Sequence, residues 1–240
     1  SPNPGSQATS TWSGIFTSKT QNDQELAYSQ YAVPHRIVAT ASYRIEYIRH
    51  LASTFTIYYE GATQGTYSYI YNGDINNDGN SSDLMYIPKD PSEIKFTSLT
   101  VSGTTYTAQQ QSDIFFKFID QDKYLSKHKG QNAERNGALY PWYHRLDFNF
   151  QQDIFNNFGR QRNTLQFNLA IVNALNLLNK DWGIKKQYIV NNPLKVASVT
   201  AGTPSYQLAT FNGAPITKTY INVNSTTTTW GIQLGLKYIF

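Results

Sequence analysis

The stretch that decides the fold is RIVATASYRIEY, residues 36–47. Its odd-numbered positions carry isoleucine, alanine and tyrosine, whereas its even-numbered positions are mostly arginine, threonine, serine and glutamate. Because successive side chains of a β-strand point to opposite faces, this alternation predicts a strand with one apolar face and one polar face.

The same period of two recurs along the chain. The further stretches that show it are 51–60, 142–154, 164–172 and 230–240. With their flanks, they predict five spanning strands, at 33–48, 51–61, 142–155, 162–173 and 227–240. Aromatic residues make up 15% of the chain and charged residues also only 15%, which is typical of a strand-rich protein. We therefore expect an all-β fold with antiparallel strands.

Composition and motifs also exclude several classes of function. The formal net charge is +4 and the basic residues are scattered, so we expect no nucleic-acid partner. Cysteine is absent, which excludes disulfides and thiolate chemistry within this chain. No apolar run reaches the length of a transmembrane helix. Serine-hydrolase, zinc-protease and phosphate-loop motifs are missing, so we expect no enzyme.

Two architectures explain strands of this kind. In a soluble sandwich the apolar face packs inward, whereas in an outer-membrane barrel it meets lipid and the polar face lines the lumen. Aromatic residues stand at both ends of the apolar faces, with Trp142 and Trp230 at one end and Tyr47, Tyr238 and Phe240 at the other. Such girdles at two membrane interfaces favour the barrel.

Strand length and loop length favour the barrel as well. The ten steps from Trp230 to Phe240 span about 33 Å, or roughly 23 Å of height at a tilt near 45°. Short turns at 48–51 and 156–161 alternate with long connections over 61–141 and 173–225. Short periplasmic turns and long extracellular loops are typical of outer-membrane barrels.

Five strands cannot close a barrel, because about eight is the lower limit. Three further segments, 66–71, 97–107 and 195–211, have strand character but lack a clean apolar face, so we interpret them as loop hairpins. The first residues read like the middle of a loop, and we expect a fragment of a larger barrel. The expected division is loops at 1–32, 62–141 and 174–226, barrel hairpins at 33–61 and 142–173, and a C-terminal barrel strand at 227–240.

A series of short motifs runs through nearly the whole chain. They are Val33-Pro34-His35-Arg36, residues 73–79 (GDINNDG), residues 83–88 (DLMYIP), residues 134–137 (ERNG), Pro141-Trp142, Arg145-Leu146-Asp147, residues 173–179 (NALNLLN), Trp182-Gly183 and the terminal Phe240. In this order and spacing, they resemble the C-terminal part of a Bacteroidota TonB-dependent outer-membrane transporter, of the SusC-like or carboxypeptidase-regulatory-domain (Oar-like) type.

The resemblance implies a barrel of about 22 strands with a lumen plug, in the outer membrane of a Gram-negative bacterium of the Bacteroidota. It implies as partners the rest of the barrel and the plug, the lipid bilayer, the outer-membrane assembly machinery, TonB acting through the plug, and a SusD-like lipoprotein. The family's plug and most of its barrel have no counterpart among these motifs, so we do not expect this chain alone to carry transport. Trp230, Leu236, Tyr238 and Phe240 resemble an assembly signal, although an ordinary edge strand explains them too.

The alternation also assigns side chains to the lumen. The lumen-facing candidates are Arg36, Arg44, Glu46, Glu60, Arg145, Asp147 and Gln166. The carboxylates on this face, which include Asp153, are suited in principle to acid–base chemistry. Because arginines alternate with them, cross-strand ion pairing is the simpler explanation.

Asp74, Asn76, Asp78 and Asp83 resemble the beginning of a calcium loop, since oxygen ligands at alternate positions suit Ca²⁺. Met85 occupies the position where an EF-hand has glutamate, and an Asx- and Gly-rich turn is the alternative. We expect no other cofactor. The histidines, His35, His50, His128 and His144, show no metal-ligand spacing.

Loop aromatics are candidates for ligand contact, above all Tyr67, Tyr69, Tyr71 and Trp182, with Tyr188 and Tyr206 as further members. They are equally suited to holding the long loops together. Residues 173–179 are expected to form an Asn-capped turn. The main hypothesis is an importer segment whose substrate stays open among peptides, glycans and metal chelates. The alternatives are a self-contained small barrel with a structural or adhesive role, and a client held on assembly or secretion machinery.

Overall fold

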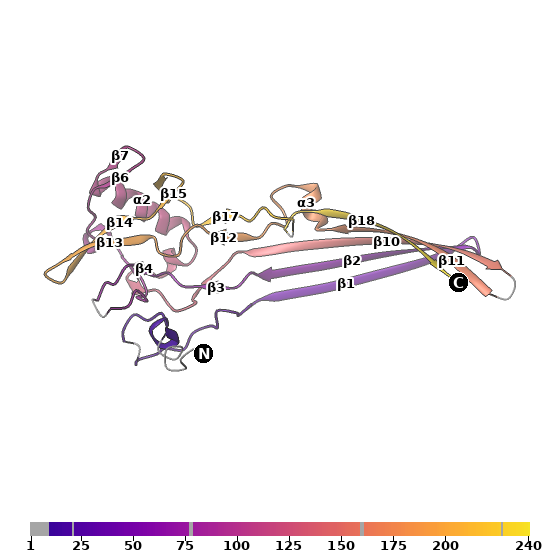
Figure 1. Ribbon diagram of the computed structural model, residues 1–240, viewed down its shortest axis with the longest axis horizontal. Helices are drawn as coiled ribbons and strands as arrows, with labels where there is room; N and C mark the ends of the chain where they lie inside the picture. Colours follow the sequence, from indigo (N-terminus) through magenta and orange to yellow (C-terminus); the bar gives the residue numbers. More distant parts are fainter. Residues whose placement is uncertain (1–9, 21, 77–78, 159–160, 227) are drawn as a thin grey trace, which may run out of the picture. The chain divides into compact units, whose positions relative to one another are not determined.

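The computed structural model describes residues 10–20, 22–76, 79–158, 161–226 and 228–240 (Figure 1). Strands predominate and helices are few, so the all-β fold class is confirmed. Among the described helices, none has the length and apolar character needed to cross a membrane. The chain divides into two compact units. We call Val33–Gln64, Pro141–Lys186 and Asn222–Phe240 the sheet unit, and Ser1–Ala32, Gly65–Tyr140 and Gln187–Ile221 the loop unit.

The sheet unit contains one five-stranded antiparallel sheet in the order β1-β2-β10-β11-β18. Its strands are β1 (Arg36–Tyr47), β2 (Leu51–Thr63), β10 (Trp142–Phe158), β11 (Gln161–Val172) and β18 (Gly231–Ile239). All five expected strands are present, but β18 begins four residues later than expected. The second short turn was predicted too long, because β10 continues to Phe158 and β11 begins at Gln161.

The register keeps the two predicted faces separate across all five strands. One row on the apolar face consists of Tyr43, Phe55, Phe150, Leu169 and Leu234, each opposite the next. The neighbouring row on the polar face consists of Ser42, Thr56, Asn149, Ala170 and Gln233. The two-residue period of each strand therefore becomes a property of the whole sheet.

The turn between β1 and β2 has an unusual backbone. Ile48 has φ of 47° and Arg49 has φ of 31°, so both lie in the left-handed region. A tight turn of mirror-image type suits the right-handed twist of the two strands, and glycine or asparagine normally occupies it. A β-branched isoleucine there is strained.

The loop unit is built from short elements around its own core. Its elements are β3 (Thr66–Tyr67), β4 (Tyr71–Asn72), β5 (Tyr86–Ile87), η1 (Pro91–Glu93), β6 (Leu99–Val101), β7 (Thr104–Tyr106), α2 (Ala108–Gln121), η2 (Leu125–Lys127), β8 (Gln131–Asn132), β9 (Ala138–Leu139), β13 (Leu194–Thr200), β14 (Thr203–Leu208), β15 (Thr210–Phe211) and β16 (Ala214–Pro215). Two further short strands, β12 (Lys186–Tyr188) and β17 (Tyr220–Asn222), pair with each other.

Two of the three expected loop hairpins are confirmed, as β6–β7 and β13–β14. The third expectation is wrong, because 66–71 splits between β3, which pairs with β9, and β4, which pairs with β13. The expected loop at 62–141 also contains the 14-residue helix α2. A capping box between Thr107 and Gln110 starts this helix, and both residues are visible in the sequence.

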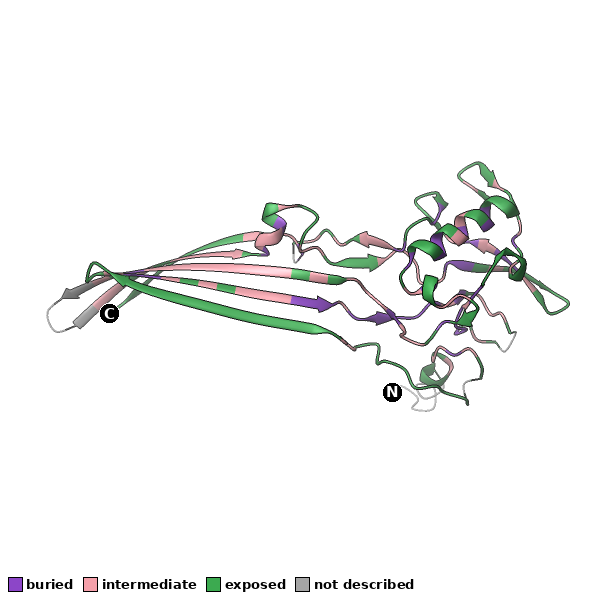
Figure 2. Cartoon of the chain, turned by 180° about the vertical axis from the view of Figure 1, so that it is seen from behind, coloured by how far each residue is buried: buried purple, intermediate pink, exposed green. Residues whose placement is uncertain are grey.

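The helix α2 turns its apolar side into the loop unit's core. Phe115, Phe118 and Ile119 are buried there, together with Met85 and Ile87. Figure 2 shows the buried positions on α2, whereas the long strands of the sheet are mostly half-buried or exposed. The hydrophobic core of the described chain thus lies in the segments that were expected to be loops.

Candidate functional site

The apolar face of the sheet is open over its whole length. Its exposed large side chains include Ile37, Tyr43, Ile45, Phe55, Ile57, Ile154, Leu165, Phe167, Ile232, Leu234 and Leu236. Among the described residues of the sheet unit, no apolar side chain larger than alanine is buried. A contiguous apolar surface of this kind marks an interaction site in a folded protein.

The polar face carries ion pairs along its length. Arg36 Nη2 lies 2.7 Å from Glu60 Oε1, and the Tyr143 hydroxyl donates to Glu60 Oε2 at 2.7 Å. Arg145 holds Asp147 through two nitrogens, at 2.8 and 2.6 Å. The Arg36–Glu60 pair joins two neighbouring strands, as the cross-strand interpretation expected. Arg145 and Asp147 instead pair within β10, which the prediction did not include.

A second polar cluster lies nearer the two short turns, β1–β2 and β10–β11. Asp153 is 4% exposed and accepts hydrogen bonds from Arg44 Nη1 at 2.8 Å, Gln166 Nε2 at 2.9 Å and Gln151 Nε2 at 3.1 Å. Arg44 also reaches Glu46 at 3.3 Å. All seven lumen-facing candidates therefore lie on one face. Asp153 is the centre of this cluster, although from the sequence it was named only among the carboxylates of the polar face and not among these seven candidates.

Beyond β11, the expected Asn-capped turn is wrong in detail. Asn173 precedes the short helix α3 (Ala174–Leu178) but makes no side-chain cap. Its Nδ2 instead donates to the carbonyls of Gly183 and Thr228, both at 2.9 Å. Asn176 Nδ2 donates to the carbonyls of Lys180 and Trp182, so both buried asparagines fold 179–183 into a compact loop.

A small cavity of about 40 Å³ lies beside this loop, lined by Tyr143, Arg145, Val172, Asn173, Gly183, Lys185 and Thr228. Asn173 Oδ1 is a buried side-chain atom without a hydrogen-bond partner among the described residues. A Cβ at Gly183 would collide with it, which explains the glycine of the Trp182-Gly183 motif.

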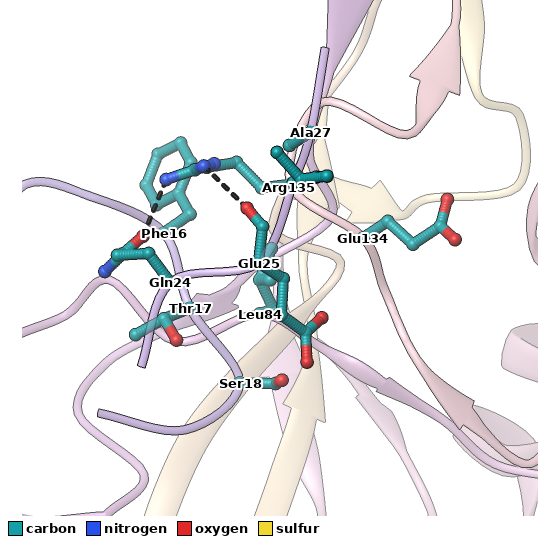
Figure 3. Close-up of a pocket in the computed structure, with 10 residues that line it drawn as sticks. Phe16, Thr17, Ser18, Gln24, Glu25, Ala27, Leu84, Glu134 and Arg135 are labelled. Carbon is teal, nitrogen blue, oxygen red and sulfur yellow. Dashed lines mark hydrogen bonds between the residues drawn. The ribbon is translucent and has the colours of Figure 1, made fainter. Parts of the chain in front are cut away.

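The ERNG motif at 134–137 has a structural role (Figure 3). Arg135 donates from Nη1 to Gln24 Oε1 at 2.7 Å and from Nη2 to the Glu25 carbonyl at 2.9 Å. Asn136 Nδ2 donates to the Tyr28 carbonyl at 2.7 Å. These bonds hold the segment 24–28 against the rest of the loop unit and close one side of a pocket of about 70 Å³. Because its guanidinium is used in this way, Arg135 is a scaffold residue of that pocket.

Three of the four candidate ligand aromatics are corrected. Tyr67, Tyr69 and Tyr71 are 5%, 0% and 6% exposed and belong to the loop unit's core. Tyr206 is also buried, and it stacks on Tyr71 with a ring distance of 5.5 Å. These tyrosines hold the loops together. Trp182 is 53% exposed, so its proposed ligand contact stays a prediction.

One of these buried tyrosines, Tyr69, bonds to a buried carboxylate, Asp122, which is 2% exposed. Its Oδ2 accepts from Tyr69 at 2.8 Å and from Thr219 at 2.7 Å, and its Oδ1 accepts from the backbone nitrogens of Tyr124 and Leu125. Burial raises the pKa of Tyr69 far above its ordinary value, with the nearby Asp122 charge as the next cause. Burial likewise raises the pKa of Tyr124 to about 12.

The suggested calcium loop is a hydrogen-bonded turn in the part that can be described. Asp74 Oδ2 accepts from the Gly79 backbone nitrogen at 2.8 Å, and Gly79 has a positive φ of 87°. Asp83 accepts from the Ile75 backbone nitrogen and from Asn76. Asp78 lies outside the described residues. Within the described ranges, no group of three or more His, Cys, Asp or Glu side chains is placed to hold a metal. Calcium binding stays a prediction.

Comparison with known proteins gives no relative. No family model, no curated protein and no solved structure matches this chain. The geometry of the two-faced sheet is therefore what bears on function.

Proposed function

We propose that this chain forms part of the wall of an outer-membrane β-barrel, as the C-terminal segment of a TonB-dependent nutrient importer. A single observation carries the proposal. The sheet keeps an exposed apolar face and an ion-paired polar face in register over five strands. Lipid covers the first face, and the second lines a wet lumen.

The soluble sandwich needs a second sheet of similar size to cover the apolar face. The described residues offer none, since the longest strand of the loop unit, β13, has 7 residues whereas β10 has 17. Strands of 9 to 17 residues match the span of a bilayer at the usual tilt. Strand length therefore supports the membrane interpretation.

The sheet ends in two strands, β1 and β18, each with one neighbour among the described strands. In hydrocarbon, an unpaired strand edge costs several kcal/mol for each unsatisfied backbone group. Both edges therefore require further strands, which supports a larger barrel over a self-contained one. The plug, the coupling to TonB, a SusD-like lid and the Bacteroidota outer membrane enter the proposal only through the motifs that resemble the transporter family.

Cysteine labelling tests the proposal directly, because the chain has no cysteine of its own. Phe167→Cys on the apolar face is compared with its neighbour Gln166→Cys on the polar face, in the intact polypeptide in membranes. We expect only the cysteine at position 167 to be shielded from a water-soluble maleimide, and only a fluorophore at 167 to be quenched by doxyl-labelled lipid. Equal labelling in a freely soluble particle would overturn the proposal.

The size of the intact polypeptide separates the importer from a small barrel. A parent chain several times larger than 27.2 kDa is expected for the importer segment. A folded, heat-modifiable species of 27.2 kDa would favour the self-contained structural or adhesive barrel instead.

A further inference from the structure

The apolar face changes character in its last two rows at the end away from the short turns. In the outermost row, His35 lies beside Thr63, which is opposite Trp142. The Thr63 backbone nitrogen donates to the His35 carbonyl at 3.0 Å, so the pairing of β1 and β2 continues through His35. In the next row, Gly61 is opposite His144.

These two rows, together with Tyr59 of the next row inward, contain a continuous stack of rings. The ring centroids of His35 and Trp142 are 6.1 Å apart, those of Trp142 and His144 are 6.2 Å apart, and those of His144 and Tyr59 are 6.1 Å apart. The interplanar angles are 11°, 16° and 20°, so each ring is nearly parallel to the next. We call His35, Trp142, His144 and Tyr59 the ring stack.

Gly61 makes the inner end of the ring stack possible. The Tyr59 hydroxyl and His144 Nδ1 are 2.7 Å apart, and they meet above Gly61. A Cβ at position 61 would lie 2.7 Å from the Tyr59 oxygen and 3.3 Å from His144 Nδ1. The glycine therefore leaves room for a hydrogen bond between two neighbouring strands.

The outer part of the ring stack carries ring nitrogens, among them the Trp142 N–H donor, that bond to no described residue. No described residue bonds to the imidazole nitrogens of His35, to His144 Nε2 or to Trp142 Nε1. Lys186 is near the same strand ends, because its backbone nitrogen donates to Gln64 Oε1 while Gln64 Nε2 donates to the carbonyl of Pro141. Among the described residues, the Lys186 ammonium has no carboxylate partner.

We propose that the ring stack binds the headgroup phosphate of a bilayer lipid at the loop end of the sheet. This inference rests on the proposed function, which places the apolar face against lipid. Indole rings combine an apolar body with an N–H donor and are enriched at membrane interfaces. Imidazole rings likewise have an apolar body and a polar tip. A phosphate oxygen accepts from such donors, and Lys186, whose backbone lies at the same strand ends, adds positive charge there. The aliphatic rows below hold the acyl chains of the same lipid.

The test uses the intact polypeptide reconstituted in lipid nanodiscs, with retained lipid counted by native mass spectrometry. The probes are phosphatidylglycerol and a phosphate-free glycosyl diacylglycerol with the same acyl chains. In the double variant His35→Phe/His144→Phe, the rings stay but their donors are lost. We expect this variant to retain phosphatidylglycerol about tenfold more weakly and the glycolipid unchanged.

The matched control is Tyr47→Phe/Tyr238→Phe, which removes polar atoms from aromatic residues at the other end of the same face. This control should retain both lipids like the unchanged protein. If the unchanged protein inserts but does not prefer the phosphate lipid, or if the histidine variant retains it equally well, the headgroup site is overturned while the proposed function stands. If cysteine labelling shows no lipid contact at position 167, both proposals fail.

Discussion

The two units of this chain differ in where their large apolar side chains lie: the loop unit buries them, whereas the sheet unit leaves them exposed or half-buried. The loop unit, formed by segments with no clean alternation, has a core of tyrosine, phenylalanine, isoleucine and leucine. The sheet unit, which has the most regular hydrophobic pattern, leaves Leu234 and Leu236 67% and 73% exposed. Regular alternation therefore predicts a two-faced strand but does not say what medium its apolar face meets.

The difference also concerns polar groups. In the loop unit, tyrosine hydroxyls enter the core only with a partner, in a chain that joins Asp122, Tyr69, Tyr67 and Tyr220. In the sheet unit, polar side chains are collected on one face and pair with one another. A buried hydroxyl needs a hydrogen bond, so the loop unit depends on a few specific contacts, whereas the sheet depends on its backbone ladder.

The largest expected effect is that of Asp122→Ala, which tests whether the loop unit can lose stability while the sheet unit keeps it. Four donors lose their acceptor, so we expect the loop unit to be destabilised by roughly 4 kcal/mol. Hydrogen exchange should then accelerate in α2 and β3, whereas β1 and β2 keep their protection. The control is Asp113→Ala on the exposed side of α2. Equal loss of protection in both units would show that they do not fold separately.

The next effect tests the faces of the sheet. Leu234→Arg places a charge in the middle of the apolar face, and Gln233→Arg places it on the polar face of the same strand. In a bilayer, the first change should cost about 3 kcal/mol and the second close to nothing. Urea unfolding of the intact polypeptide in vesicles measures the difference. Similar costs for both variants would contradict the lipid-facing assignment.

Alkaline pH should affect the loop unit selectively. Burial raises the pKa of Tyr140 and of Tyr220 to about 12. Below pH 10 both the folded and the unfolded state hold these protons, and the stabilisation is complete. Between about pH 10 and 12 only the unfolded state ionises, so the stability of the folded state falls as the pH rises.

Near-ultraviolet circular dichroism as a function of pH checks this expectation. Tyr220→Phe should weaken the dependence of stability on pH above 10, whereas Tyr31→Phe, at a position 83% exposed, should leave it unchanged. A near-ultraviolet signal that stays constant to pH 12 would contradict this expectation, because neither tyrosine ionisation nor loss of packing would then have occurred.

The smallest expected effect concerns the turn between β1 and β2. Replacing Ile48-Arg49 by Asn-Gly removes two strained positive φ angles and should stabilise the hairpin by about 1 kcal/mol. Unfolding of the intact polypeptide in vesicles measures this change. The matched control is Ile239→Asn, because Ile239 lies in β18 and has no positive φ angle. This control should not increase the stability. A loss of stability in the turn variant would show that Ile48 makes contacts that outweigh its strain.

The candidate site was predictable where it follows from local periodicity. The arginines and carboxylates of the polar face were expected to pair across strands because their parity places them on one face, as Arg36 and Glu60 do. The choice of partners was not predicted, nor was the pairing of Arg145 with Asp147 within one strand. Asp122 and the tyrosines around it were not predictable in this way, since they come from segments far apart in the chain. The capping box at Thr107 was a visible signal for α2, but α2 is buried only because other loop segments pack on it.

The sequence by itself determined the five strands, their two faces and the short turn after β1. These features depend on neighbouring residues, because strand geometry alone sends alternate side chains to opposite sides. Only the tertiary structure decided the register that aligns five apolar faces, the burial of Tyr67, Tyr69 and Tyr71, and the stack of His35 on Trp142. These features join residues distant in the chain, and contacts of that kind are specified by packing and hydrogen bonding in three dimensions.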